Sequence, residues 1–429
     1  MRRAASPRLG AARLRQPARL RRPARLRRPA LAAALIVAAL AGAAPSAHAA
    51  AGMELALQDD PVFLHRDYYD RDQALAKARE MGVTRLRVSL GWAAVLGAQA
   101  SARTQPSPVV YDFSAYDDLI DAAAGYGIRL QINLIPPAPA WATGDRKIGV
   151  NRPDPAQYGR FVRAAAEHFK GRIDRWALWN EPNHVGWLTP QSSAAAQYRA
   201  LYLAGYNQIK RVDRSAEVLI GELVPYKNGN RSSAPLTFLR QLTCTRTASG
   251  VPGARGYRMR KQGRCAPLRA DGLAHHPYEY QGPPERSFPG NDNVTIGTLG
   301  RMTSTLTELG RLRALAMPRR RVTPLFITEF GYFGQGRNSH PDLRRASYLR
   351  RAYQIAQRNP MVRQMTQYLL VRPPRLYTGS YFDMSIMLPT GEPLAPYREL
   401  SRWARSAARR GQIAAPGAPI SLPARPPGA

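Results

Sequence analysis

Short apolar runs alternate with helix-length amphipathic segments along most of this chain, and this alternation restricts the fold more than any other feature. Runs of four to eight aliphatic residues between turn signals are typical of buried strands. We predict strands at Thr84–Val88, Arg129–Leu134, Asp174–Trp179, Glu217–Ile220, Gly272–His275, Pro324–Thr328 and Met365–Leu370, with a weaker one near Leu55. Strands separated by helices indicate βαβ units and a parallel sheet.

The segments between these runs carry helix signals. Gly82 is a natural C-cap for a helix over Asp72–Met81, and Ser114 is a good N-cap for Ala115–Tyr126. Further helices are predicted over Pro155–Lys170, Ser192–Val212, Ile296–Leu315, Leu343–Arg358 and Tyr397–Ala408. Seven or eight such units predict an α/β protein with one (β/α)8 TIM barrel domain, which we place at residues 50–409.

Residues 1–49 do not belong to this domain. They contain 11 Arg and no acidic residue, then an apolar run from Ala30 to Ala44 and a small-x-small sequence, Ala47-His48-Ala49. A positive segment, an apolar segment and a small-x-small site together predict a signal peptide for bacterial export. The apolar run is shorter than the ~20 residues that a membrane helix needs, so we expect no stable membrane span. We expect a secreted protein, outside the cell or at the cell envelope; retention of residues 1–49 as an anchor is the alternative.

Two further segments depart from the alternation. Residues 225–270 are irregular and basic, and we interpret them as an insertion on the active-site side of the barrel. They hold both cysteines, Cys244 and Cys265, and an even count in an exported chain predicts a disulfide. Residues 410–429 are rich in Pro and Gly, and we predict a disordered tail.

The charge of the chain restricts its partners only weakly. Removing the 11 arginines of residues 1–49 lowers the formal charge from +34 to +23. A solvated arginine-rich surface explains this excess, and so does attraction to an anionic polymer. Nucleic acid is a poor candidate, because the chain carries no known nucleic-acid-binding motif. We expect a monomer.

Two glutamates follow apolar runs and carry the functional hypothesis. Glu181 lies in Trp179-Asn180-Glu181-Pro182-Asn183, and Glu329 lies in Ile327-Thr328-Glu329-Phe330-Gly331. In a (β/α)8 barrel, residues at the carboxyl ends of strands form the active site. A pair of carboxylates there is what glycoside hydrolysis needs, with one acid to transfer a proton and one to attack or stabilise the anomeric carbon.

Other residues are predicted to support this pair. Arg87 is expected to contact Glu329, because a buried arginine is costly unless it is paired. Asn180 is expected to bind the sugar 2-hydroxyl, Tyr278 to hydrogen-bond Glu329, and His276 to line the sugar site. Trp141, after the third strand, either stacks on a sugar ring or packs beneath its loop.

Metal and nucleotide chemistry are disfavoured. His275 and His276 are adjacent, and neighbours in a strand point to opposite faces, so they do not make a zinc pair. The glycines of Gly331–Gly336 lack the Lys-Ser/Thr that follows a phosphate-binding loop. We expect no cofactor and no metal.

The chain resembles the glycoside hydrolases of clan A, in the neighbourhood of families 5 and 39. The motifs that carry the resemblance are Arg87, Asn180-Glu181-Pro182, His276-Pro277-Tyr278, Thr328-Glu329-Phe330-Gly331 and the stretch from Ser385 to Tyr397. The resemblance covers about residues 55–408 and implies a retaining double displacement, with Glu181 as acid/base and Glu329 as nucleophile. The clan usually places a Trp on the eighth strand, whereas this region reads Gln367-Tyr368-Leu369-Leu370, so Tyr368 is the candidate substitute.

The sequence thus predicts a secreted retaining glycosidase that acts on a poly- or oligosaccharide. The basic surface favours an anionic saccharide as the substrate. A transglycosylase uses the same covalent intermediate and stays open. A non-catalytic carbohydrate-binding or cell-envelope protein on a barrel scaffold is the alternative from another class, since fold alone does not establish chemistry.

Overall fold

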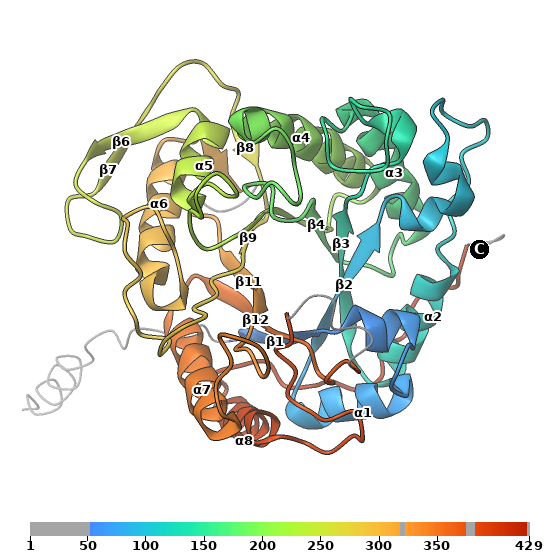
Figure 1. Ribbon diagram of the computed structural model, residues 1–429, viewed down its shortest axis with the longest axis vertical. Helices are drawn as coiled ribbons and strands as arrows, with labels where there is room; N and C mark the ends of the chain where they lie inside the picture. Colours follow the sequence, from blue (N-terminus) through green and yellow to red (C-terminus); the bar gives the residue numbers. More distant parts are fainter. Residues whose placement is uncertain (1–51, 318–321, 375–381, 427–429) are drawn as a thin grey trace, which may run out of the picture. The chain divides into compact units, whose positions relative to one another are not determined.

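The computed structural model describes residues 52–317, 322–374 and 382–426 (Figure 1). The predicted signal peptide at residues 1–49 lies outside them. The chain divides into two units, Met1–Ser46 and Ala47–Ala429, and all described residues belong to the second.

Eight parallel strands of the described residues form a closed barrel, which confirms the predicted TIM barrel. Each strand pairs with its neighbours, and β1 closes the ring by pairing with both β2 and β12. In chain order the strands are β1 (Glu54–Gln58), β2 (Arg85–Gly91), β3 (Arg129–Ile135), β4 (Arg175–Leu178), β5 (Glu217–Leu223), β9 (Gly272–His275), β11 (Leu325–Phe330) and β12 (Val362–Tyr368).

An α-helix follows each barrel strand, and Figure 1 shows these helices around the ring of strands. They are α1 (Arg71–Met81), α2 (Ser114–Gly125), α3 (Pro155–His168), α4 (Ala194–Val212), α5 (Pro235–Thr243), α6 (Leu299–Arg311), α7 (Asp342–Arg358) and α8 (Ala395–Arg409). Short helices of other types span Pro61–His65, Ala94–Ser101, Ala140–Ala142, Gln191–Ser193 and Ile296–Thr298. Within the described ranges, no helix combines the length and the apolar character needed to cross a bilayer.

The helix ends follow local rules. Gly82 ends α1 in the left-handed conformation with φ of 97°, as the sequence predicted. Asp70 caps the start of this helix by accepting a hydrogen bond from the Gln73 N–H. At α2 the sequence interpretation was wrong in detail, because Ser114 is the first helical residue and Asp112 accepts from its N–H and hydroxyl.

Apolar side chains fill two regions of the barrel. The larger cluster packs between the strands and the surrounding helices. A smaller cluster has one residue from each of four adjacent strands: Ala177, Leu219, Ala274 and Phe326. Because side chains alternate between the faces of a strand, this second cluster fills the inside of the barrel.

The insertion at 225–270 has parts with different positions. Its first residues, from Tyr226 to Ser232, lie in a loop at the carboxyl end of β5. After α5 follows an antiparallel hairpin, β6 (Thr245–Ser249) with β7 (Arg258–Lys261), and then β8 (Leu268–Arg269), which pairs with β10 (Leu315–Ala316). The hairpin packs against α6, where the Met259 N–H donates to Glu308 at 2.8 Å. Only the first part of the insertion is therefore on the active-site side.

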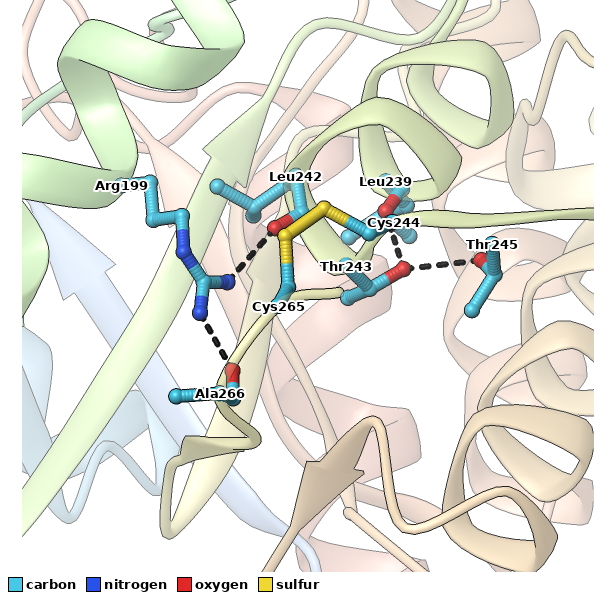
Figure 2. The surroundings of a disulfide bond; sticks show 8 residues. All are labelled: Arg199, Leu239, Leu242, Thr243, Cys244, Thr245, Cys265 and Ala266. Atoms are coloured by element: carbon cyan, nitrogen blue, oxygen red, sulfur yellow. Dashed lines mark hydrogen bonds between the residues drawn. A yellow bond between two sulfur atoms is a disulfide. The ribbon is translucent and has the colours of Figure 1, made fainter. Parts of the chain in front are cut away.

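The predicted disulfide is present and joins the end of α5 to the end of this hairpin (Figure 2). Cys244 is the C-cap of α5 and bonds to Cys265, 21 residues later, with Cα atoms 5.9 Å apart. Arg199 of α4 donates to the carbonyls of Leu242 and Ala266 on the two sides of the bridge. Such a crosslink contributes roughly 3 kcal/mol in the loop-entropy model.

Residues 410–426 differ from the predicted disordered tail, because they contact the barrel at several points. Ile413 is buried and forms a bridge with Met53, next to β1. The Ile420 N–H donates to the Ala124 carbonyl of α2 at 2.9 Å. Arg425 donates to Asp118 and Asp121 of the same helix at 2.9 and 2.8 Å. Backbone hydrogen bonds, one buried isoleucine and an arginine thus hold a segment whose Pro and Gly content alone indicated disorder.

Candidate active site

A pocket of about 900 Å³ opens at the carboxyl-terminal end of the barrel strands. Residues at the ends of β2, β3, β4, β5 and β11 line it, and both predicted catalytic residues, Glu181 and Glu329, are among them. An oxygen of each of these two carboxylates and a ring nitrogen of His276 all lie within 4.8 Å of one another. The barrel therefore brings together two acids that are far apart in the sequence.

Glu181 follows β4 on a strained turn. Trp179 and Glu181 have φ of 70° and 40°, which costs about 1–3 kcal/mol per residue unless the surroundings hold them. The Trp179 N–H donates to the Leu134 carbonyl at 3.0 Å, and the Glu181 N–H donates to the Glu222 carbonyl at 2.9 Å. The neighbouring strands β3 and β5 thus fix the direction of this acid.

Glu329 lies on β11 with a hydrogen-bond donor at each oxygen. Arg87 Nη1 of β2 donates to its Oε1 at 2.8 Å, and the Tyr278 hydroxyl donates to its Oε2 at 2.9 Å. The side chains of Arg87 and Tyr278 are almost fully buried. Two fixed donors orient this carboxylate toward the pocket.

A third carboxylate, Glu222, lies behind this pair, and the sequence interpretation missed it. Its Oε2 accepts from His276 Nε2 at 2.6 Å, Thr328 Oγ1 at 2.6 Å and Arg87 Nη2 at 3.1 Å. His276 uses its other nitrogen, Nδ1, to contact Glu181 Oε1 at 2.9 Å. His276 therefore bridges two carboxylates and lies beneath the pocket without lining it.

A backbone distortion directs Glu222 into the site. The pairing between β5 and β9 shifts register between Gly221 and Leu223, and Glu222 has φ of 53°. Gly221 has φ of 119°, and a Cβ there would lie 2.4 Å from the Ala274 carbonyl oxygen. Only glycine fits this close approach. The predicted strand ended at Ile220, so the sequence signal for Glu222 was the Gly-Glu pair directly after it.

The charges of these groups depend on one another. Burial opposes a charge on His276, but Glu329 and the hydrogen bonds to Glu181 and Glu222 outweigh it and raise its pKa to about 10. Burial also opposes ionisation of Glu222, yet Arg87 and His276 lower its pKa. For Glu329, burial raises the pKa, against the opposing charges of His276 and Arg87. The cluster therefore contains two buried cations and a carboxylate that is harder to ionise than an ordinary glutamate.

Residues after β1 extend the site, although the sequence interpretation did not select them. Gln58 accepts a hydrogen bond from Arg87 and donates to Asp60 at 3.2 Å. Asp60 also accepts from the Ser89 N–H at 3.2 Å, and it lines the pocket. Their signal was the Gln58-Asp59-Asp60 stretch at the end of the weakest predicted strand.

Aromatic residues form the pocket wall beside Glu329. Tyr368 lines the pocket and lies 5.6 Å from Phe382, measured between ring centroids. Phe382 also packs edge-on against Tyr278 and Phe333, at 5.5 and 5.3 Å. Tyr368, the candidate substitute for an eighth-strand Trp, and Phe382 are thus neighbours in this wall.

The other predicted site residues divide into two groups. Asn180 lines the pocket, and its Oδ1 accepts from Arg87 Nη2 at 3.1 Å, which leaves its Nδ2 group available as a donor. Trp141 does not line the pocket, since it is buried in the core cluster beneath its loop. His275 contacts the carbonyls of Leu223 and Val294, away from the site, as expected for adjacent residues of a strand.

Glu181, His276 and Glu329 are also the one group of described residues whose ligand atoms lie close enough to hold a metal ion. A metal needs a neutral imidazole nitrogen. Both nitrogens of His276 contact carboxylates, which favours the doubly protonated ring. This chemistry fits an acid–base cluster better than a metal site.

Comparison with known proteins relates the barrel to glycoside hydrolases. A family 39 glycoside hydrolase from Bacteroides cellulosilyticus WH2 matches with a TM-score of 0.56 and 18% identity, over 82% of this chain and 63% of that one. A monomeric beta-xylosidase from Caulobacter crescentus CB15 matches with a TM-score of 0.53 and 19% identity, over 82% and 69% of the two chains.

In sequence, a 6-phospho-beta-glucosidase from Dickeya chrysanthemi is 29% identical over 146 residues. This match spans 32% of the present chain and 30% of that protein. No model of a known protein family matches the chain. The resemblance to glycoside hydrolases inferred from the motifs is thus supported, and at these identities the property shown to be shared is the barrel fold.

Proposed function

We propose that the protein is a retaining O-glycoside hydrolase, with Glu329 as nucleophile and Glu181 as general acid and base. The observation that carries the proposal is the distance between the two acids, which present oxygens within 4.8 Å of each other at the base of one pocket. Retaining enzymes hold their carboxyl groups about 5–5.5 Å apart, whereas inverting enzymes need about 6.5–9.5 Å to admit a water molecule. The glycosidases of similar fold support the same reaction class.

The surroundings of the two acids suit these roles. In the first step, a Glu329 oxygen attacks the anomeric carbon, the bond to the leaving oxygen breaks, and Glu181 gives that oxygen its proton. In the second step, Glu181 takes a proton from water, which attacks the same carbon and releases Glu329. His276 occupies Oε1 of Glu181, so Oε2 is the atom that exchanges the proton. Arg87 and Tyr278 hold Glu329 in line.

We propose further that the protein works outside the cytoplasm. The arginine-rich and apolar segment at residues 1–49 has the order of a secretion signal. The Cys244–Cys265 bridge is typical of proteins that fold in an oxidising compartment. Fractionation of cells that express the full chain, followed by N-terminal sequencing, would test both export and cleavage.

Hydrolysis of a panel of poly- and oligosaccharides and aryl glycosides tests the reaction. We expect turnover by the wild type, and a loss of about 10⁴-fold or more in kcat for Glu329→Ala, as for removal of other nucleophiles. Azide should rescue this variant by forming a glycosyl azide of inverted configuration. Glu217→Ala, on β5 at the far end of the barrel, serves as control and should keep wild-type kcat.

Two results would contradict the proposal. Unchanged turnover in Glu329→Ala would remove its assigned role. Equal glycan binding by the wild type and Glu181→Gln, with no cleavage by either, would instead favour a carbohydrate-binding protein. Analysis of products at high acceptor concentration would show whether sugar transfer competes with hydrolysis.

A further inference from the structure

The wall of the pocket next to Glu181 is built from two loops joined by backbone hydrogen bonds. The Asn183 side chain accepts from the Val224 N–H at 3.0 Å and donates to the Ser233 carbonyl at 2.8 Å. The Val185 N–H donates to the Arg231 carbonyl at 2.8 Å. The loop after β4 and the first part of the insertion therefore form one unit, which we call the joined-loop wall (residues 183–188 and 224–233).

This wall faces the leaving group if Glu181 is the proton donor. The Glu181 carbonyl accepts from the His184 N–H at 2.9 Å, so His184 comes one turn after the acid. His184 and Trp187 line the pocket, as do Asn228 and Arg231 from the other loop. The transferred sugar would lie instead near Glu329, Tyr368 and Phe382. Side chains of the joined-loop wall are thus placed to contact whatever is bound beyond the scissile oxygen.

Arg231 gives this wall its charge. Among the residues that line the pocket, Arg231 is the one Lys or Arg, and no carboxylate of the described residues forms an ion pair with it. Its charge acts on His184, where burial and then Arg231 lower the pKa, against the opposing charge of Glu181. His184 Nδ1 accepts from the Gly186 N–H at 3.0 Å, which requires an unprotonated Nδ1. The proton of the ring then lies on Nε2, for which the described residues provide no acceptor.

We propose that the joined-loop wall is a subsite for an anionic leaving group, bound by the Arg231 guanidinium and His184 Nε2–H. The ligand class is a sugar or aromatic ring that carries a carboxylate, phosphate or sulfate group, with Trp187 available to pack on the ring. The inference rests on the proposed function, because Glu181 must be the proton donor for this wall to face the leaving group. It names a substrate class that the two catalytic acids alone do not select.

The test compares two aryl glycosides with the same sugar, para-nitrophenyl and its ring-carboxylated analogue, each as glucoside and xyloside. An exposed ion pair contributes up to about a fivefold effect, so we expect kcat/KM of the wild type to favour the carboxylated substrate by about fivefold at low salt. Arg231→Gln should remove this preference. Arg214→Gln is the matched control, since Arg214 is exposed on the loop before β5, at the opposite end of the barrel.

An equal preference in the wild type and Arg231→Gln would overturn the proposal. A ring-phosphorylated analogue of the substrate shows whether the subsite prefers a phosphate or a carboxylate group. A preference for either anion that depends on Arg231 supports the subsite. If the wild type hydrolyses none of these substrates, the wider glycan panel decides the proposed function and calorimetry tests the subsite. Carboxylated nitrophenol should then bind the wild type more tightly than para-nitrophenol does, whereas the two phenols should bind Arg231→Gln with equal affinity. The same difference in affinity in both proteins would overturn the proposal.

Discussion

The two ends of the barrel use the same kinds of charged side chain in different ways. At the amino-terminal end, Glu54 of β1 accepts from Arg85 at 3.1 Å and also pairs with Arg175. Each arginine has a second acid, Asp174 at 2.6 Å for Arg85 and Glu217 at 2.7 Å for Arg175. The two buried arginines of this amino-end cluster, Arg85 and Arg175, are thus each paired twice.

At the carboxyl-terminal end, the acids outnumber their cationic partners, and two of the acids, Glu181 and Glu329, line a pocket. Arg87 and His276 lie among Glu181, Glu222 and Glu329. One oxygen of Glu222, Oε1, is buried without a hydrogen-bond partner among the described residues. Burying carboxylates in this way is costly, because a charge loses its hydration.

The pKa values show the consequence of this difference. Burial opposes ionisation of Glu54, but Arg85 and Arg175 outweigh it and lower its pKa. For Glu329, burial prevails and the pKa is raised. The amino-end cluster therefore stabilises the fold with fully ionised pairs, whereas the carboxyl end holds a reactive acid at the expense of stability. Three changes test this contrast.

Glu222→Gln should have the largest effect. Replacing the carboxylate removes charged hydrogen bonds worth about 1.5–3 kcal/mol each, so we expect kcat to fall by about 10- to 100-fold. The pKa of His276, about 10 in the wild type, should fall because Glu222 helps to raise it. Kinetics and NMR titration of the His276 ring measure these changes. Glu217→Gln on the same strand is the control. If the pKa of His276 in Glu222→Gln equals the wild-type value, Glu222 does not affect the charge of His276 and the prediction is wrong.

Glu54→Gln should affect stability and leave catalysis intact. Arg85 and Arg175 lose one partner each but keep Asp174 and Glu217, so we expect a loss of about 2 kcal/mol in the free energy of unfolding. Denaturant unfolding measures this loss. The control is Glu80→Gln, which removes the exposed Lys77–Glu80 pair and should cost about 0.5 kcal/mol or less. A fall in kcat as large as that of Glu222→Gln would erase the distinction between the two ends.

The smallest effect concerns the pH dependence of stability. Glu54 has a lowered pKa in the folded state, so it stabilises the fold at pH values above the pKa that it has in the unfolded chain. This stabilisation is lost as the pH falls through the folded-state pKa. Glu329, with a raised pKa, contributes below its unfolded pKa of about 4.3 and loses that contribution as the pH rises through the folded value. Glu329→Gln should therefore be at least as stable as the wild type at pH 7, measured by chemical unfolding. A clear loss of stability confined to neutral pH would show that the reasoning is wrong.

The sequence predicted the barrel because its periodic signals are local. The barrel strands and seven of its helices were visible as runs of the right length, and Glu181 and Glu329 stood at the ends of two strands. The helix α5 and the hairpin β6–β7 were missed, because they lie in the segment 225–270 that was interpreted as irregular. Glu222 was missed because the predicted strand ended at Ile220, whereas β5 continues through a bulge against β9 to Leu223. A bulge depends on the partner strand, which local patterns do not describe.

Other features depended on tertiary contacts in the same way. Phe382 reaches the aromatic wall from a loop that has no periodicity of its own. The contacts of residues 410–426 include backbone hydrogen bonds and the side chains of Ile413 and Arg425, which are few among many Pro and Gly residues. Trp141 had two interpretations, and only the packing of its loop separates them.

The most direct test of the central claim is the configuration of the first product. Proton NMR of an aryl glycoside during the earliest turnovers shows the anomeric form released before mutarotation. Carboxylates this close should form a glycosyl ester on Glu329 and release the sugar with the same anomeric configuration as the substrate. Initial release of the opposite anomer would contradict the double displacement and the roles given to Glu181 and Glu329.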